Sequence, residues 1–245
     1  MNKPNVPAVE NAIRILHEIA EKSGETTSSA LARRLGASQP TTYRILKTLE
    51  SADWIRADES GGYRLSIGML PLLTHLDDFT RYRRIAQPIL DGLSRSLELT
   101  VKFSLRQGLE QIIVATSHPR KPFSVSVPLG GRFPIVWGSP GACLLAGLSK
   151  KEIDLLIERI PEDSWKHETP KALKKRLQEL HKTGSCKSIG EHYLSIDTVS
   201  VKLDTDSTPS ALTLVALRGE LTERNLPRCR EELKQSALEL AAALR

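Results

Sequence analysis

Residues 26–65 read TTSSALARRLGASQPTTYRILKTLESADWIRADESGGYRL, and this stretch predicts a helix-turn-helix followed by a short β-hairpin. Residues 27–35 have the pattern of a short capped helix, and Gly36-Ala37-Ser38 forms a tight turn. A second helix is expected over residues 39–49. Ser38 is its predicted N-cap, because a serine side chain accepts a hydrogen bond from an otherwise unpaired backbone N–H.

The second helix has one apolar face and one polar face. Ile45, Leu46 and Leu49 recur at helical spacing, so we expect them to face the domain core. The opposite face suits the DNA major groove, where Arg and Gln bond base edges while Thr, Tyr and Lys reach phosphates. The outward residues are Gln39, Thr41, Tyr43, Arg44 and Lys47.

Charge and the following hairpin support this interpretation. Between Arg33 and Thr48 there are four cations and no acid, which predicts an unopposed positive field on one face. Residues 54–65 alternate apolar and polar side chains around Gly61-Gly62, as a β-hairpin does. A helix-turn-helix closed by such a hairpin is a winged helix, and we expect it to bind DNA. The alternative is an ordinary helical hairpin whose polar face is merely solvated.

Composition is that of a globular protein of one or two domains. The chain has 245 residues, 40% apolar and 26% charged, with a net charge of +6. That charge agrees with a polyanionic partner without establishing one. Three widely spaced cysteines argue against a secreted disulfide framework. The sequence has neither an apolar signal region at its start nor a run long enough to span a membrane, so we expect a cytoplasmic protein.

The rest of the chain predicts an α+β arrangement with a mostly antiparallel sheet. Strands are expected near residues 101–105, 111–116, 185–191, 198–203 and 211–218, and Phe123, Val125 and Val127 are expected to form another, before a glycine-rich loop at 128–134. Helices are expected over residues 139–148, from the capping box at 149–152 to Pro161, from Thr169 to Gly184, and over 222–244.

The predicted boundary between the domains lies at residues 71–84, with a winged helix at 1–70 and a second domain at 85–245. The first helix is expected from Val9 to Lys22 and to end at Gly24. Its apolar face is predicted to carry Val9, Ala12, Ile13, Leu16 and Ile19. A short helical connector interrupted by Pro71 should follow the wing. The basic cluster at 81–84 could touch DNA phosphate or simply be a solvated helix start.

Motifs for catalysis, metal binding and cofactor binding are missing from the sequence. The six histidines show no HExxH or paired spacing, and Gly138-Ser139-Pro140-Gly141 lacks the order of a nucleophile elbow. Glu191-His192 is better read as a strand end or pocket rim than as an acid–base pair. We therefore expect no catalytic residues, metal or cofactor. The rival hypothesis is an enzyme with a catalytic C-terminal domain and a winged helix used for protein contacts.

The chain resembles the IclR family of bacterial transcriptional regulators over nearly its full length. The matching stretches are 8–19, 31–49, 63–65, 134–146 and 221–223. The resemblance implies a winged helix, a linker helix and a GAF-like effector-binding domain. It also implies dimers, often paired into tetramers, on palindromic operators, with small organic or aromatic acids as effectors.

The family's DNA-contact positions can be carried onto this sequence residue by residue. The base-reading positions fall on Gln39, Pro40, Thr41, Tyr43, Arg44 and Lys47. The wing would bring Gly61, Gly62 and Arg64 near the DNA backbone.

The effector pocket departs from the family pattern. Members hold a carboxylate with two consecutive backbone N–H groups before the small-residue helix, and these positions are Ser139 and Pro140, of which proline has no N–H. The family's first pocket acid is replaced by Ser188, a frequent Cys by Thr198, and two serines by Thr213 and Val215. Losing one donor to a carboxylate costs about 1.5–3 kcal/mol, so the small-carboxylate site is not expected to be intact.

An aromatic or larger acid is the expected replacement. Leu129, Phe133 and Trp137 lie near the implied pocket, and Val215 removes a hydroxyl. We expect Thr198, Thr213 and Trp137 to contact such a ligand. The alternative is that Trp137 belongs to the core or to a dimer interface.

Overall fold

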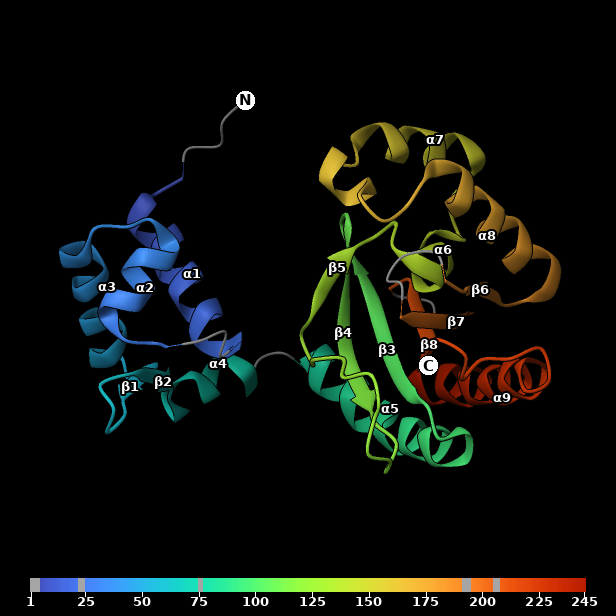
Figure 1. Cartoon of the computed structure of the whole chain (residues 1–245), viewed down its shortest axis with the longest axis horizontal. Coiled ribbons are helices and arrows are strands. Elements are labelled where there is room, and N and C mark those ends of the chain that lie inside the picture. Colours follow the sequence, from blue (N-terminus) through green and yellow to red (C-terminus); the bar gives the residue numbers. More distant parts are fainter. Residues whose placement is uncertain (1–4, 22–24, 75–76, 191–194, 205–207) are drawn as a thin grey trace. The chain divides into compact units, whose positions relative to one another are not determined.

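The computed structural model describes residues 5–21, 25–74, 77–190, 195–204 and 208–245. The chain divides into two compact units, Met1–Asp77 and Asp78–Arg245, and the division falls within the 71–84 segment. Each unit is described by itself below (Figure 1).

The first unit is a helical domain with a two-stranded hairpin. Its elements are α1 (Pro7–Glu21), α2 (Ser28–Leu35), α3 (Gln39–Ser51), β1 (Ile55–Ala57), β2 (Tyr63–Leu65), the 3-10 helix Ile67–Met69 and α4 (Leu70–Thr74). Thr27 caps α2 and Ser38 caps α3, each accepting a backbone N–H at 3.3 Å. Gly36 ends α2 in the left-handed conformation with φ of +63°. The predicted winged helix-turn-helix is confirmed. Pro71 does not interrupt a helix as predicted, because it lies in the first turn of α4, where a missing N–H costs nothing.

The core of this unit corrects the predicted face of α1. Ile15 and Ile19 are buried, and Ala12 and Leu16 pack partly against them. Val9 and Ile13 are instead 56% and 52% exposed. Because α1 is apolar on more than one side, its sequence alone could not specify which side meets α2 and α3. The predicted helix end at Gly24 lies outside the described residues.

The second unit is built on a six-stranded sheet with strand order β5-β4-β3-β8-β7-β6. The strands are β3 (Thr100–Gln107), β4 (Glu110–Ser117), β5 (Arg132–Pro134), β6 (Cys186–Ser188), β7 (Ile196–Leu203) and β8 (Ser210–Leu217). Every pairing is antiparallel, which confirms the predicted α+β class.

Helices cover the sheet on both faces, as Figure 1 shows. On one face, α5 (Asp77–Leu97) and α9 (Leu226–Leu244) share a core with residues such as Leu90, Phe103 and Leu233. The other face carries α6 (Gly138–Leu145), α7 (Lys150–Arg159), the 3-10 helix Glu162–Trp165 and α8 (Pro170–Thr183). The predicted capping box at Ser149 and Glu152 is present, and Thr169 and Gly184 cap α8 as predicted.

Two predicted elements are wrong. Residues 123–127 form no strand, and Phe123 is 80% exposed. Prolines at 119, 122 and 128 surround this segment, and proline cannot donate to a strand ladder. The short edge strand β5 forms instead within the predicted loop. The last helix begins at Leu226 rather than Thr222, because Asn225 Oδ1 accepts the Thr222 backbone N–H at 2.8 Å and closes a turn there.

Candidate functional site

Helix α3 presents its polar face to solvent. Ile45, Leu46 and Leu49 point into the core, while the predicted DNA contacts are exposed, with Tyr43 at 51%. These exposed residues are Gln39, Pro40, Thr41, Tyr43, Arg44 and Lys47. Thr41 is oriented by a 2.7 Å hydrogen bond between its hydroxyl and that of Ser38. Side chains of the types that can bond bases or phosphates therefore project from the exposed face of α3.

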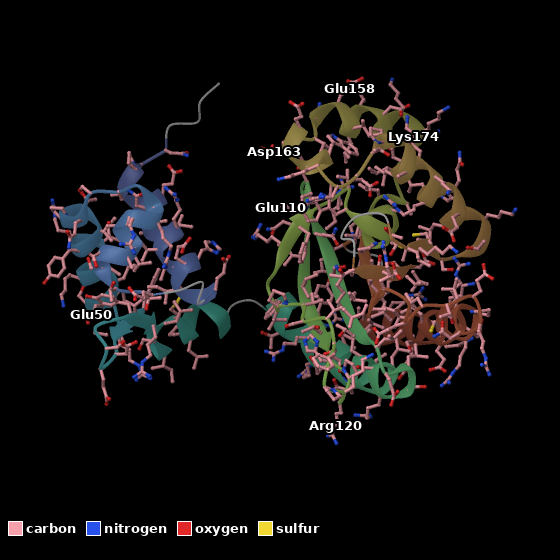
Figure 2. All side chains as sticks on the ribbon, viewed as in Figure 1. Glu50, Glu110, Arg120, Glu158, Asp163 and Lys174 are labelled. Atoms are coloured by element: carbon pink, nitrogen blue, oxygen red, sulfur yellow. The ribbon has the colours of Figure 1, made fainter. Side chains whose placement is uncertain are left out.

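Ion pairs correct the predicted unopposed positive field. Arg34 pairs with Glu18 of α1, and Lys47 pairs with Glu50 one turn further along α3, both at 2.7 Å (Glu50 is labelled in Figure 2). The hydrogen bond with Lys47 lowers the pKa of the partly exposed Glu50 carboxyl. A count of charges between residues 33 and 48 missed both acids, because they lie outside that window. Arg44 keeps no ion-pair partner in the described part of the chain.

The hairpin places two cations side by side. Arg56 and Arg64 are directly opposite each other across β1 and β2, and both are exposed. Like charges at opposed positions weaken the pairing of a hairpin, so this pair of arginines does not stabilise the wing. Arg56 was missed from the sequence because its partner is known only once the strands are in register. Gly61 adopts φ of +77°, so it serves the turn itself.

A cavity of about 220 Å³ opens between the sheet and α6. Six predicted effector residues line it: Phe133, Trp137, Pro140, Ser188, Thr198 and Val215. Trp137 lines the cavity, and it also packs against the core of this domain, with its Nε1 donating to the Ser164 carbonyl at 2.8 Å. Sequence reasoning missed Lys102, Gln111, Val125, Ser126, Val127, Gly138 and Ile196.

Three predicted effector residues are not on the cavity wall. Leu129 is 40% exposed and does not line the cavity. Ser139 and Thr213 are fully buried behind it, in a chain of hydroxyls that begins at Thr198 on the wall. Ser139 Oγ lies 2.8 Å from Thr198 Oγ1 and 2.7 Å from Ser200 Oγ, and Ser200 lies 2.8 Å from Thr213 Oγ1.

The first turn of α6 departs from the geometry implied by the family. Ser139 and Pro140 lie inside this helix rather than in the loop before it. Its leading N–H, that of Gly138, donates to Glu168 Oε2 at 3.3 Å. Glu168 in turn forms a buried ion pair with Arg176 of α8. A carboxylate of the chain itself therefore occupies this helix terminus, which favours negative charge.

Lys102 is the only titratable side chain among the described residues that line the cavity. It lies on β3, is 7% exposed, and its Nζ lies 5.1 Å from the centroid of the Phe133 ring. Burial lowers the pKa of the Lys102 ammonium to about 8. A lysine on a strand with alternating apolar and polar residues normally faces solvent. Lys102 is buried because both faces of the sheet are covered at β3, and the sequence of the strand does not indicate this.

Two family models match the chain. The model of the bacterial transcriptional regulator IclR C-terminal region covers residues 78–242, and the IclR helix-turn-helix domain model covers residues 8–59. The chain belongs to the IclR family. It is therefore a transcriptional regulator with a helix-turn-helix domain and the family's ligand-binding C-terminal domain.

Relatives of this IclR-family chain span nearly its whole length. The HTH-type transcriptional repressor AllR of Escherichia coli (strain K12) is 23% identical over 246 residues, covering 97% of this chain and 90% of that protein. An IclR regulator from Alicyclobacillus acidocaldarius has a TM-score of 0.79 at 24% identity, covering 98% of this chain and all of that chain. An IclR homologue from Microbacterium hydrocarbonoxydans, solved with 4-hydroxybenzoate, has a TM-score of 0.81 at 17% identity. The match covers 97% of this chain and 99% of that chain.

The family membership decides between the two function classes considered. The AllR relatives are transcriptional repressors, and both matching models belong to the IclR family of transcriptional regulators, so this chain is not an enzyme. The rival hypothesis of a catalytic C-terminal domain is wrong.

None of the helices in the described ranges combines the length and apolarity needed to cross a bilayer.

Proposed function

We propose that this IclR-family regulator binds a palindromic operator through α3 and the wing, as a dimer or a pair of dimers. We further propose that a small organic acid in the C-terminal cavity controls this binding. In this proposal residues 1–70 form the DNA-binding domain, 71–84 the linker and 85–245 the effector domain. The observation that carries it is the exposed polar face of α3 on a helix whose other face is fully packed. Because promoter DNA is the partner, the protein would act in the cytoplasm.

On the DNA, α3 enters the major groove and the wing lies along the backbone. Arg44 and Gln39 read base edges, while Thr41, Tyr43 and Lys47 position the helix on phosphates. Arg56 and Arg64 contact phosphate from the hairpin, and Gly61 lies at its exposed turn. Gly62, expected near the DNA backbone, is buried instead, and a Cβ there would lie 2.9 Å from Thr26 Oγ1 and 3.0 Å from Asp58 Oδ2. Two copies would place their recognition helices about 34–36 Å apart, one helical turn of DNA.

In the C-terminal domain, the aromatic and apolar cavity wall favours an aromatic acid as effector. Phe133, Trp137 and Val215 supply this wall, and an IclR homologue of similar fold has been solved with 4-hydroxybenzoate. The acid changes operator affinity only if it binds the DNA-competent and DNA-free conformations with different affinities.

A mobility-shift assay on the DNA upstream of the gene tests the DNA-binding part. Arg44→Ala should weaken specific binding by at least about 1 kcal/mol, because a base-reading contact is lost. Arg14→Ala, at an exposed position on α1, is the matched control and should retain wild-type affinity. Equal operator retention by the Arg44 variant and wild type would show that α3 does not read the groove. Recording the salt dependence separates sequence-selective from purely electrostatic retention.

A further inference from the structure

The cavity wall holds two polar side chains whose bonding needs are unmet within the described part of the chain. One is the Lys102 ammonium, and the other is the side-chain carbonyl oxygen of Gln111. Buried polar groups of folded proteins nearly always have partners, so each unmet group calls for an explanation.

Among the described residues, Lys102 has no counter-charge. Its cross-strand neighbours are Thr116 on β4 and Thr213 on β8, neither of which carries a charge. No carboxylate in the described ranges pairs with it, and its one specific contact is with the Phe133 ring. An unpaired buried ammonium is costly, because a low-dielectric site stabilises charge poorly. A ligand carboxylate would supply the missing partner.

The side-chain oxygen of Gln111 has no hydrogen-bond donor among the described residues. Gln111 is 1% exposed, and its Nε2 donates to the carbonyls of Pro134 at 3.0 Å and Trp137 at 3.1 Å. These two carbonyls fix the amide orientation, because an oxygen cannot take the place of the nitrogen beside them. Oε1 therefore remains a buried acceptor without a hydrogen-bond partner in the described residues. A ligand hydroxyl or amino group would meet that need.

The two groups border one aromatic surface. Phe133 is the cross-strand partner of Gln111 in the β4–β5 pair, and the same ring lies beneath Lys102 Nζ. The other candidate anion position, the N-terminus of α6, is already occupied by Glu168. A ring lying against Phe133 can thus present an anionic group to Lys102 and a donor to Gln111.

We propose that the cavity recognises an organic acid that also carries a hydrogen-bond donor, with Lys102 binding the carboxylate and Gln111 Oε1 accepting the donor. A hydroxy-substituted aromatic acid is the simplest member of this class. The proposal rests on the proposed function only in taking this cavity as the effector site.

Calorimetric titration of the full chain with matched ligands tests both contacts. The probes are benzoate, the three hydroxybenzoates, their primary amides and 4-methoxybenzoate. At least one hydroxybenzoate should bind tenfold or more tightly than its amide, the factor expected for one hydrogen bond to a charged group. It should also bind several-fold more tightly than benzoate. Failure of every acid to bind, or equal affinities for acids and amides, would overturn the proposal.

Matched variants assign the anion contact to Lys102. Lys102→Met should abolish the preference for acid over amide, and Lys102→Gln provides a second uncharged variant. Lys202→Met is the control, since Lys202 is an exposed lysine of β7 that pairs with Asp204 and does not line this cavity. Acid preference retained in folded Lys102→Met, or lost in Lys202→Met, would contradict the assignment. The Gln111 contact is tested through the ligand, because changing Gln111 would also release the Pro134 and Trp137 carbonyls.

Operator binding separates this inference from the proposed function. If wild type binds its operator and an uncharged metabolite releases it, the Lys102 assignment fails while the regulator proposal stands. If hydroxybenzoates bind through Lys102 but the protein retains no DNA, the regulator proposal fails while the ligand class stands.

Discussion

At the scale of single residues, burial of the Lys102 ammonium costs stability, and the proposed ligand carboxylate would offset that cost. The difference between its pKa of about 8 and the ordinary 10.5 corresponds to on the order of 3 kcal/mol lost by burying the charge. The other described residues that line the cavity lie on β4 to β8, on α6 and its N-cap, and at 125–127. None of them has a titratable side chain that faces Lys102. Binding sites commonly carry such a cost in the unliganded protein.

Lys102→Met should therefore stabilise the ligand-free protein at pH 7, by up to about 3 kcal/mol. Between pH 8 and 10.5 the unfolded chain holds this proton while the folded chain has lost it, so wild-type stability rises with pH across that window. The difference in free energy of unfolding between Lys102→Met and wild type should therefore be smaller at pH 9.5 than at pH 7. Urea unfolding at pH 7 and pH 9.5 measures both effects. A variant less stable than wild type at pH 7, or a gap independent of pH, would count against an unpaired ammonium.

At the scale of elements, the buried pair of Glu168 and Arg176 ties α8 to the first turn of α6. The side chains of both residues are almost completely buried, and Glu168 also accepts the Thr169 N–H at 2.9 Å. Through Gly138 this carboxylate helps to hold the helix that forms one wall of the cavity. Gly141 permits the close packing of α6, because a Cβ there would lie 2.2 Å from the Ile135 carbonyl oxygen.

Glu168→Gln should destabilise the protein by about 3–5 kcal/mol, because the buried ion pair between Glu168 and Arg176 would be broken. Asp154→Asn is the matched control between α7 and α8. Asp154 pairs with Lys174, labelled in Figure 2, at 2.7 Å, and the two side chains are 44% and 47% exposed. Loss of this pair should change the stability little, because solvent screens the interaction between exposed charges. Urea unfolding of both variants gives the comparison, and equal small losses would show that the buried pair is not holding α6.

At the scale of the whole molecule, the proposed function requires that effector and operator be coupled reciprocally. If an acid lowers operator affinity by a given factor, operator DNA must lower acid affinity by the same factor. Allosteric couplings commonly amount to about 1–3 kcal/mol, or roughly 5- to 150-fold. Anisotropy of labelled operator and calorimetry of acid binding, each with and without the other partner, should return one factor. Unequal factors would mean that a second binding event contributes.

Elements were predicted correctly where the interactions that define them join residues close in the sequence. The caps at Thr27, Ser38 and Ser149 act within three residues, so the helices that they begin were located from sequence. The polar face of α3 follows from helical periodicity in the same way. The strand predicted over residues 123–127 is wrong, because an alternating pattern is compatible with a strand but does not indicate which neighbouring strand would pair with it.

Sequence alone determined the helix-turn-helix, its capped ends and the residues on its outer face, because these depend on contacts within one or two turns. Only the tertiary structure decided that Lys102 is buried beside Phe133, that Glu168 occupies the start of α6, and that Arg56 opposes Arg64. Each of these contacts joins residues from different elements. Their energies depend on burial and register, which exist only after the chain has folded.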